Sequence, residues 1–311
     1  MLGIFVQSYD CEGRWGVADR LTEALRDQIT GPELEAAYSQ LADILDKHSL
    51  QATFAFVGAF MIDEPTLVSY LPLLRSLDSR CPGYLNSFLA DAEKGKLSDW
   101  LGSNCLTKLR STRMRHEFAT HGFTHIPWDW PGFSRDVAVS EIRAIREIAA
   151  TLGIPMRTFV FPRNAVSHLS AWEGGNFIGY RRSVMWRSRA ARLLHEFHLW
   201  ENADRNTNIA RLIAIPGGQF MNIRFGARRL VPTAVTIARW RHIVDSACRS
   251  GGVAHLWCHP ENFVEAPDGI DVLHEILAHV ERRRVEGRLI VMTQEAYCDA
   301  VIEGRVGNNS Q

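Results

Sequence analysis

The sequence predicts an α/β protein whose parallel sheet closes, fully or in part, into a barrel. Two observations predict this fold class. Short apolar runs alternate along the chain with segments of helical periodicity, and within the runs apolar residues are almost continuous. Strands of that kind are buried on both faces, as in parallel sheets covered by helices. With 311 residues, 46% of them hydrophobic, the chain can bury a large core.

The individual elements follow from local patterns. Short apolar runs bounded by turn residues are the predicted strands: 2–7, 52–57, 117–120, 158–161, 212–215, 253–258 and 288–292. Segments with apolar residues three and four positions apart are the predicted helices: Leu34 to Leu45, Ala138 to Leu152, Ile237 to Ala247 and Leu273 to Val280. Gly153 and Pro155 are predicted to end the second of these helices.

Two stretches interrupt the alternation. Residues 61–112 carry several prolines and glycines, and residues 164–211 are polar and rich in arginine and asparagine. Neither is a linker that would divide the chain. We therefore predict one domain covering residues 1–311, with both stretches as insertions at one rim, where specificity residues usually lie.

Composition excludes several classes of protein. Lys+Arg and Asp+Glu both total 35, so there is no charge excess to attract nucleic acid or anionic lipid. No apolar run reaches the roughly 18 residues of a membrane span, and residues 1–7 lack the features of a signal peptide. The six cysteines have no framework spacing, as in reduced proteins. We expect a cytoplasmic protein with no nucleic-acid partner and no membrane span; a homo-oligomer stays open.

Polar residues that could carry chemistry follow four of the predicted strands. The carboxyl ends of parallel strands meet at one rim of a barrel. The residues concerned are Asp10 and Glu12, His121 and His125, Arg163 and Asn164, and finally His259. We therefore expect them to lie around one site.

Three of these residues form a plausible set of metal ligands. Asp10 and Glu12 are two positions apart, so in an extended segment both carboxylates share a face, and ionising both requires a compensating cation. His121 and His125 can reach one ion from a helical turn or a tight loop at Gly122. One carboxylate and two imidazoles leave open positions for water and substrate. Zinc is the expected ion, with cobalt, nickel, iron and manganese as alternatives.

The segment around His259 supplies further candidates. In 253–258 alternation places His255, Trp257 and His259 on one face, with His259 as the natural general acid at the strand end. His255 lies deeper and is predicted to be a core or supporting residue. Four residues near these motifs are the predicted substrate contacts: Trp128, Asn164, Trp257 and Asn262. For Trp128, packing in the core is the alternative.

Taken together, the motifs resemble those of the polysaccharide deacetylase family, also called the NodB homology group or carbohydrate esterase family 4, in an atypical Asp-x-Glu branch. Ser8-Tyr9-Asp10-Cys11-Glu12-Gly13 is similar to the first family motif. His121 to His125 is similar to the second, with Gly122 in place of a hydroxyl residue. Pro162-Arg163 is similar to the third in inverted order, and His259 before Pro260 to the last.

The resemblance implies a fold and a set of roles. The fold is a distorted, incompletely closed (β/α) barrel of about seven parallel strands. Asp10 is the implied catalytic base and His259 the acid, with Arg163 as the partner of the base. The implied metal ligands are Glu12, His121 and His125.

The expected function is therefore that of a metal-dependent amide hydrolase. It would remove an N-acyl group, acetyl or formyl, from an amino sugar, such as a glycan precursor used in surface-polysaccharide assembly. Two alternatives remain. One is a hydrolase of a small non-sugar amide or cyclic amide, and the other is a carbohydrate-binding relative without catalysis, suggested by the inverted order of Pro162 and Arg163.

Overall fold

The computed structural model describes residues 2–172, 176–183, 195–198, 203–204, 211–223 and 226–306. Its strands are β1 (Gly3–Cys11), β2 (Thr53–Phe56), β3 (Glu117–Thr120), β4 (Thr158–Phe159), β5 (Gly179–Arg181), β6 (Ile213–Ile215), β7 (Gln219–Phe220), β8 (Val253–Cys258) and β9 (Leu289–Met292). Its α-helices are α1 (Glu23–Gln28), α2 (Gly31–His48), α3 (Glu64–Ser69), α4 (Leu71–Arg80), α5 (Asn86–Glu93), α6 (Ser103–Arg110), α7 (Arg135–Leu152), α9 (Thr233–Ser250), α10 (Glu261–Glu265), α11 (Gly269–Val285) and α12 (Gln294–Ile302).

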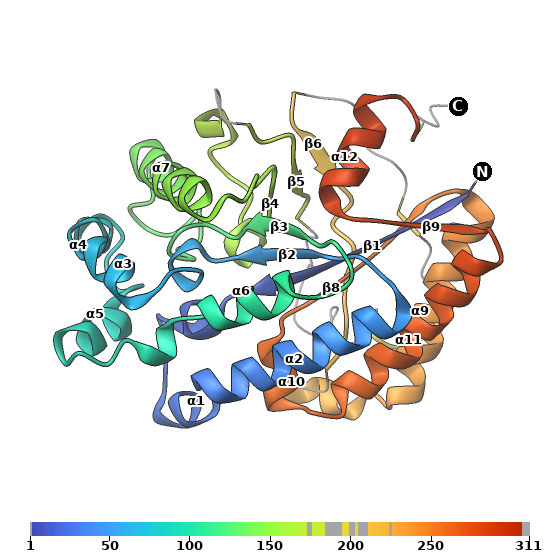
Figure 1. Cartoon of the computed structure of the whole chain (residues 1–311), viewed down its shortest axis with the longest axis horizontal. Helices are drawn as coiled ribbons and strands as arrows, with labels where there is room; N and C mark the ends of the chain where they lie inside the picture. Colours follow the sequence, from blue (N-terminus) through green and yellow to red (C-terminus); the bar gives the residue numbers. More distant parts are fainter. Residues whose placement is uncertain are drawn as a thin grey trace.

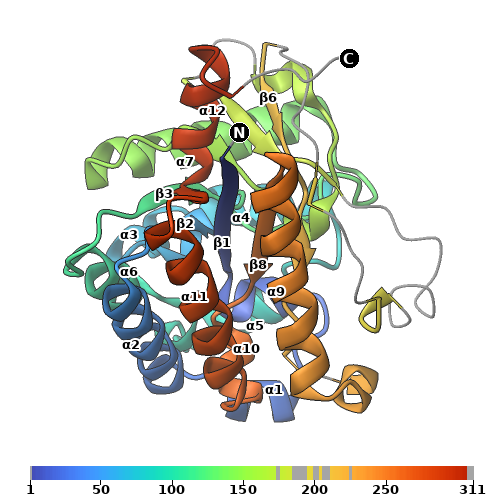
Figure 2. The same ribbon diagram turned by 90° about the vertical axis from the view of Figure 1, so that its right-hand side faces the viewer.

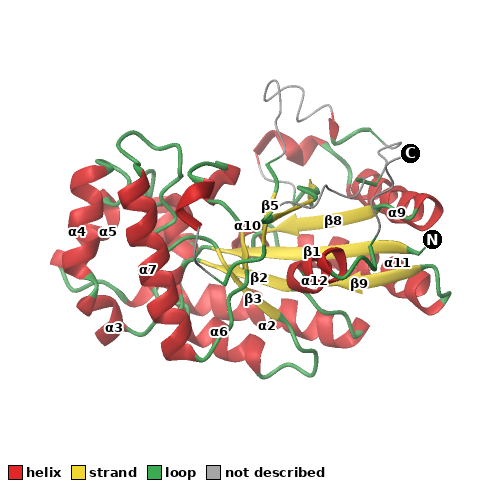
Figure 3. Cartoon of the chain, turned by 90° about the horizontal axis from the view of Figure 1, so that it is seen from above, coloured by secondary structure: helices red, strands yellow, loops and turns green. Residues whose placement is uncertain are grey.

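The strands form one curved parallel sheet with helices outside it (Figures 1 and 3). Its order is β6-β5-β4-β3-β2-β1-β8-β7, and β9 pairs with the first half of β1. Within the described residues no hydrogen bonds join β6 to β7, the two ends of this order. The barrel is therefore incompletely closed, as the family resemblance implied.

The core lies on both faces of β1. All nine residues of this strand are buried, which explains its continuous apolar run. Helices α2, α11 and α9 lie side by side outside it (Figure 2). The predicted apolar stripe of α2, from Leu34 to Leu45, is buried against the sheet, and α7 ends at Gly153, whose φ of 63° suits glycine.

All seven predicted strands are present, but the expected number was too small. Among the described residues the sheet has nine strands, and β5 and β7 were missed. They contain three and two residues, too few to produce a recognisable period. Because β5 lies within 164–211, that stretch contributes a strand to the sheet and is more than a decoration of its rim.

The other stretch, residues 61–112, forms the helices α3 to α6. Its buried aromatic residues, among them Tyr84, Phe88 and Trp100, join the same hydrophobic cluster as the strands. Among the described residues, no helix is both long and apolar enough to cross a membrane.

Candidate active site

Three of the predicted ligand atoms converge at the carboxyl ends of β1 and β3. The Oε1 atom of Glu12 lies 2.9 Å from Nε2 of His121 and 3.0 Å from Nε2 of His125. The two imidazole Nε2 atoms are 3.2 Å apart. Both histidines are buried, and the Glu12 side chain is 14% exposed. The grouping expected from the sequence is therefore present as geometry.

The loop after β3 is built to bring both histidines to one point. Gly122 has φ of 84° and His125 has φ of 65°, so the chain turns tightly where the sequence left a helical turn or a loop open. Buried Glu141 of α7 accepts hydrogen bonds from the amides of Phe123 and Thr124, at 2.7 and 3.2 Å, and from the Thr124 hydroxyl at 2.6 Å. Burial raises the pKa of Glu141 to about 7 despite these bonds. Glu141 thus holds the loop between His121 and His125 in this conformation.

The hydrogen bonds at the far side of each ring define which nitrogen faces the centre. His121 donates from Nδ1 to the carbonyl of Val160 at 2.7 Å. The Tyr84 hydroxyl donates to the carbonyl of Trp15 at 3.1 Å, so its oxygen accepts from Nδ1 of His125 at 2.6 Å. Burial lowers the pKa of His125, which favours its neutral ring. In a neutral imidazole whose proton is on Nδ1, Nε2 carries a lone pair and no proton.

This donor set fits a divalent metal ion. Two bare Nε2 atoms and a carboxylate oxygen, all acceptors, lie within 3.2 Å of one another. Without a cation they repel each other, whereas bonds of about 2.0–2.1 Å to one ion suit these separations. In histidine ligands, the ring nitrogen that does not bind the metal also usually donates a hydrogen bond to a fixed acceptor. Glu12, His121 and His125 could therefore hold the ion.

Asp10 lies beside this set, one residue before the end of β1, and is paired with an arginine. Arg181 donates from Nη1 to Oδ1 at 2.7 Å and from Nη2 to Oδ2 at 2.6 Å. The side chains of both are at most 2% exposed. Although burial alone raises it, Arg181 and then His121 lower the pKa of Asp10. The carboxylate is therefore ionised and held in one orientation.

The predicted partner of Asp10 was wrong. Arg163 instead pairs with Asp19, with Nη2 2.5 Å from Oδ1, and its guanidinium lies over the ring of Tyr84. Its backbone has φ of 53°, in the left-handed region within the 3-10 turn Pro162–Asn164, and its side chain contacts Asp19 in place of Asp10. Arg181 was missed because β5 is too short to be recognised and because Arg181 is one of several arginines in a polar stretch.

His259 follows β8 and faces Glu12 across the site. Its Nδ1 lies 3.0 Å from Oδ1 of Asn262, which accepts the proton, and its Nε2 lies 3.4 Å from Oε1 of Glu12. Burial alone would lower the pKa of His259, but Glu12, Asp10 and Glu261 together raise it to about 10. The side chain is 26% exposed. It therefore combines a proton at neutral pH with access to the cavity.

The predicted substrate contacts divide into two groups. Trp128 is fully buried and stacks on Trp172 at 5.2 Å between ring centroids, so it belongs to the core and offers no face to a substrate. Asn164, Trp257 and Asn262 are half-buried and line the cavity above the site. Asn164 also accepts a hydrogen bond from Arg181 at 3.1 Å, which ties it to the Asp10 pair.

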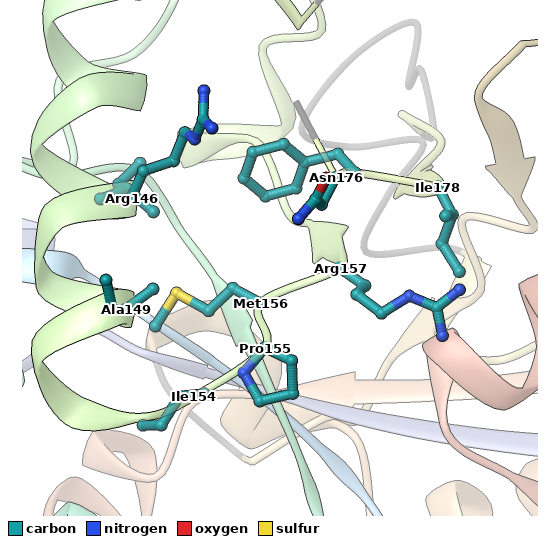
Figure 4. A pocket seen from close by; sticks show the side chains of 11 residues that line it. Arg146, Ala149, Ile154, Pro155, Met156, Arg157, Asn176 and Ile178 are labelled. Atoms are coloured by element: carbon teal, nitrogen blue, oxygen red, sulfur yellow. The ribbon is translucent and has the colours of Figure 1, made fainter. Parts of the chain in front are cut away.

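The structure has a large cavity above these residues and another elsewhere. The site cavity has a volume of about 1020 Å³ and is lined by Glu12, Trp257 and His259 among others. The second cavity, of about 650 Å³, lies between α7 and the segments flanking β4 and β5 (Figure 4). None of its lining residues lines the site cavity. Of the residues grouped at the site, Glu12 and His259 line the first cavity.

Comparisons with known proteins bear on the fold. No family model matches the sequence, and no curated protein matches it. The structure is similar to that of a protein named as a polysaccharide deacetylase from Mycobacterium smegmatis, with a TM-score of 0.62 and 15% identity, covering 99% of this chain and 93% of that one. It is also similar to one so named from Pseudomonas aeruginosa PAO1, with a TM-score of 0.57 and 9% identity, covering 98% and 92%. The chain therefore has the fold that the resemblance implied.

Proposed function

We propose that this chain, which has the fold of the polysaccharide deacetylases, is a metal-dependent hydrolase that removes an N-acyl group from an amino sugar. The observation that carries the proposal is the arrangement of three kinds of group around one cavity. They are a carboxylate held by an arginine, a carboxylate with two imidazoles, and a histidine that faces them across the site. Hydrolysis of an amide needs all three: a base, an electrophile and an acid.

The base is Asp10. A divalent cation held by Glu12, His121 and His125 would lower the pKa of a water molecule and polarise an acyl carbonyl. Candidate ligand atoms of Asp10, Glu12 and His259 all lie within 4.8 Å of one another, so Asp10 can take a proton from water bound in this space. Arg181 keeps the carboxylate ionised and prevents it from turning away.

The acid is His259. Because its Nδ1 proton is engaged by Asn262, a second proton on Nε2 is directed toward Glu12 and the cavity. Hydroxide from the water adds to the acyl carbon, the carbon–nitrogen bond breaks, and the Nε2 proton goes to the leaving nitrogen. The products are a carboxylic acid, acetate or formate after ionisation, and a free amine.

The cavity supports a sugar as the substrate. Trp130, Phe220 and Trp257 line it with partly exposed rings, and flat apolar faces beside amides and charged groups suit the faces and hydroxyls of a sugar. A volume of about 1020 Å³ reaches the upper end of small-molecule sites, about 300–1,000 Å³. It has room for a sugar unit with a carrier group, so we propose a nucleotide-linked or lipid-linked precursor of a surface polysaccharide.

The test is release of acid from a panel of substrates. Purified protein, supplied in turn with zinc, cobalt, nickel, iron and manganese, is incubated with N-acetyl and N-formyl amino sugars, linear amides and hydantoin-like cyclic amides. We expect acetate or formate from the sugars, and a loss of at least 100-fold in Asp10→Asn. Release of acid from the non-sugar amides alone would show that the substrate is a small amide and not a sugar. No release from any of them, or equal release by Asp10→Asn, would overturn the proposal.

The non-catalytic alternative is tested by the same assay. His259→Ala keeps every group of the proposed metal set and removes the proton donor. Turnover that disappears in this variant, with metal content unchanged, excludes a protein that only binds carbohydrate.

A further inference from the structure

A buried chain of hydrogen bonds leads through the interior of the barrel to Asp10, the proposed base. It runs from the carbonyl of Pro216 through His255, Ser8 and Arg181 to Asp10. We propose that Ser8 and His255 are positioning residues for the reaction. They hold the guanidinium of Arg181 in the orientation that makes two hydrogen bonds to the carboxylate of Asp10. The inference rests on the proposed function, because it concerns the orientation of the proposed base.

The strands place these residues directly under the site. Ser8 and Asp10 are two positions apart on β1 and share its inner face. His255, Trp257 and His259 share a face of the neighbouring β8 in the same way, and Ser8 is in register with Trp257. Ser8 and His255 therefore lie one layer below Asp10 and His259, inside the barrel.

Every proton in the chain has an assigned place. Nδ1 of His255 lies 2.6 Å from the carbonyl of Pro216 and must donate to it. Nε2 is then an acceptor, and the Ser8 hydroxyl, 2.9 Å away, donates to it. This leaves the lone pairs of Ser8 Oγ for Nη1 of Arg181, at 3.2 Å. Burial, followed by the charge of Arg181, lowers the pKa of His255 to about 3, so the ring stays neutral and the direction of the chain is fixed.

A tight turn is built around the ring of His255. Gly218 has φ of 67°, and a Cβ at this position would lie 2.2 Å from the carbonyl oxygen of His255 and 2.8 Å from its ring. A larger residue in this left-handed conformation would push the turn, and with it Pro216, away from the imidazole. The backbone is therefore shaped to keep the carbonyl of Pro216 on Nδ1.

Arg181 depends on such support because its own strand is short. Strand β5 has three residues, and Arg181 is the last of them. Its guanidinium is held by Ser8 on one side, by Asn164 on another and by the ring of Trp257, 4.5 Å from Cζ. Without the Ser8 acceptor, Nη1 loses the contact that sets the plane of the guanidinium, and the two-bond contact with Asp10 loosens.

The test compares the loss of a buried hydroxyl inside the chain with the loss of one outside it. Ser8→Ala removes the hydroxyl, and His255→Leu removes the acceptor behind it. Thr158→Val is the matched control, because Thr158 is also buried in a strand and donates to a buried carboxylate, that of Glu117, outside the site. Ser8→Thr restores the hydroxyl.

We expect kcat of Ser8→Ala to fall by about 10- to 100-fold, as for displacements of a reacting group by about 1 Å, with KM and bound metal unchanged. Ser8→Thr recovers kcat. The double variant Ser8→Ala/His255→Leu loses no more than the worse single variant, because both act through one bond. A kcat of Ser8→Ala within twofold of wild type, or a loss matched by Thr158→Val, would overturn the inference.

A crystal structure of Ser8→Ala separates this inference from the proposed function. If wild-type protein turns over no substrate, the proposed function fails. The crystal structure of Ser8→Ala then tests the positioning role of Ser8 without an activity assay. A guanidinium that has turned from Asp10 supports the positioning role of Ser8. A guanidinium that keeps both bonds to Asp10 refutes it.

Discussion

The phenol of Tyr84 offers a direct test of the proposed metal site, because its hydroxyl is the sole difference from phenylalanine. Tyr84 lies before α5, in the 61–112 stretch, and is fully buried. Its oxygen accepts from Nδ1 of His125 at 2.6 Å and donates to Trp15 at 3.1 Å. Tyr84→Phe removes both bonds and keeps the ring that packs edge-on against Trp130, 5.3 Å between centroids.

The size of the effect follows from the tautomer of His125. With the hydroxyl present, the proton stays on Nδ1 and Nε2 is free for the ion. Without it, Nδ1–H is buried and unpaired, so the ring gains by moving its proton to Nε2, where it blocks the metal. Loss of such an outer partner typically lowers metal affinity by about 10- to 100-fold, which is about 1.4–2.7 kcal/mol of binding free energy.

The assay is competition for zinc against a chromogenic chelator, with wild type and Tyr84→Phe titrated side by side. Tyr70→Phe is the matched control, because the Tyr70 hydroxyl is exposed and bonds to Glu147 at 3.2 Å, away from the site. We expect its zinc affinity to equal that of wild type. If folded Tyr84→Phe also binds zinc within twofold of wild type, Tyr84 does not orient His125 and the tautomer argument is wrong.

Two further predictions concern Gly16, which lies beside Glu12, and the buried carboxyl group of Glu117 on β3. In Gly16→Ala the new Cβ would lie 1.9 Å from Oε2 of Glu12, so the carboxylate must move; we expect zinc affinity to fall at least tenfold in the same titration. Gly31→Ala, where the nearest such atom is 3.9 Å away, should bind as wild type, and equal affinities in the two variants would contradict the reasoning. Burial raises the pKa of Glu117 from 4.5 to about 7, so its protonated form stabilises the fold below pH 4.5 and this stability is lost as pH rises to about 7. Between pH 5 and pH 8 the free energy of unfolding, measured with urea, should change by about 2.5 kcal/mol less in Glu117→Gln than in wild type. An identical change in both proteins would show that Glu117 is not buried as a neutral acid.

The sequence carried most of the information about where chemistry could occur. Apolar runs mark the strands, because a parallel strand must be apolar on both faces. The residue after such a run lies at the rim of the barrel, because the carboxyl ends of parallel strands meet there. Asp10, Glu12, His121 and His125 could therefore be grouped from position alone, and the structure brings the atoms of the last three within 3.2 Å. How these residues act stays a prediction.

Contacts made across the sheet could not be predicted in the same way. Arg163 and Arg181 are both arginines in polar surroundings, and nothing local distinguishes them. The difference arises from the backbone: Arg163 has a left-handed φ of 53°, whereas Arg181 is in an extended strand whose pairing with β6 and β4 aims its side chain inward. Strand pairing between residues far apart in the chain sets that direction, and three residues are too few to reveal it.

The same distinction explains why two of the supporting residues lie in the two stretches without motifs. A reacting group must have one chemical type, so it leaves a recognisable pattern near a strand end. A supporting group needs only a hydrogen bond in the right place, which Tyr84 supplies to His125 from 61–112 and Arg181 supplies to Asp10 from 164–211. These stretches were expected to carry specificity, yet each supplies a buried partner to one half of the proposed machinery. Deleting or exchanging either one to alter substrate choice should therefore first impair metal affinity or the orientation of the base.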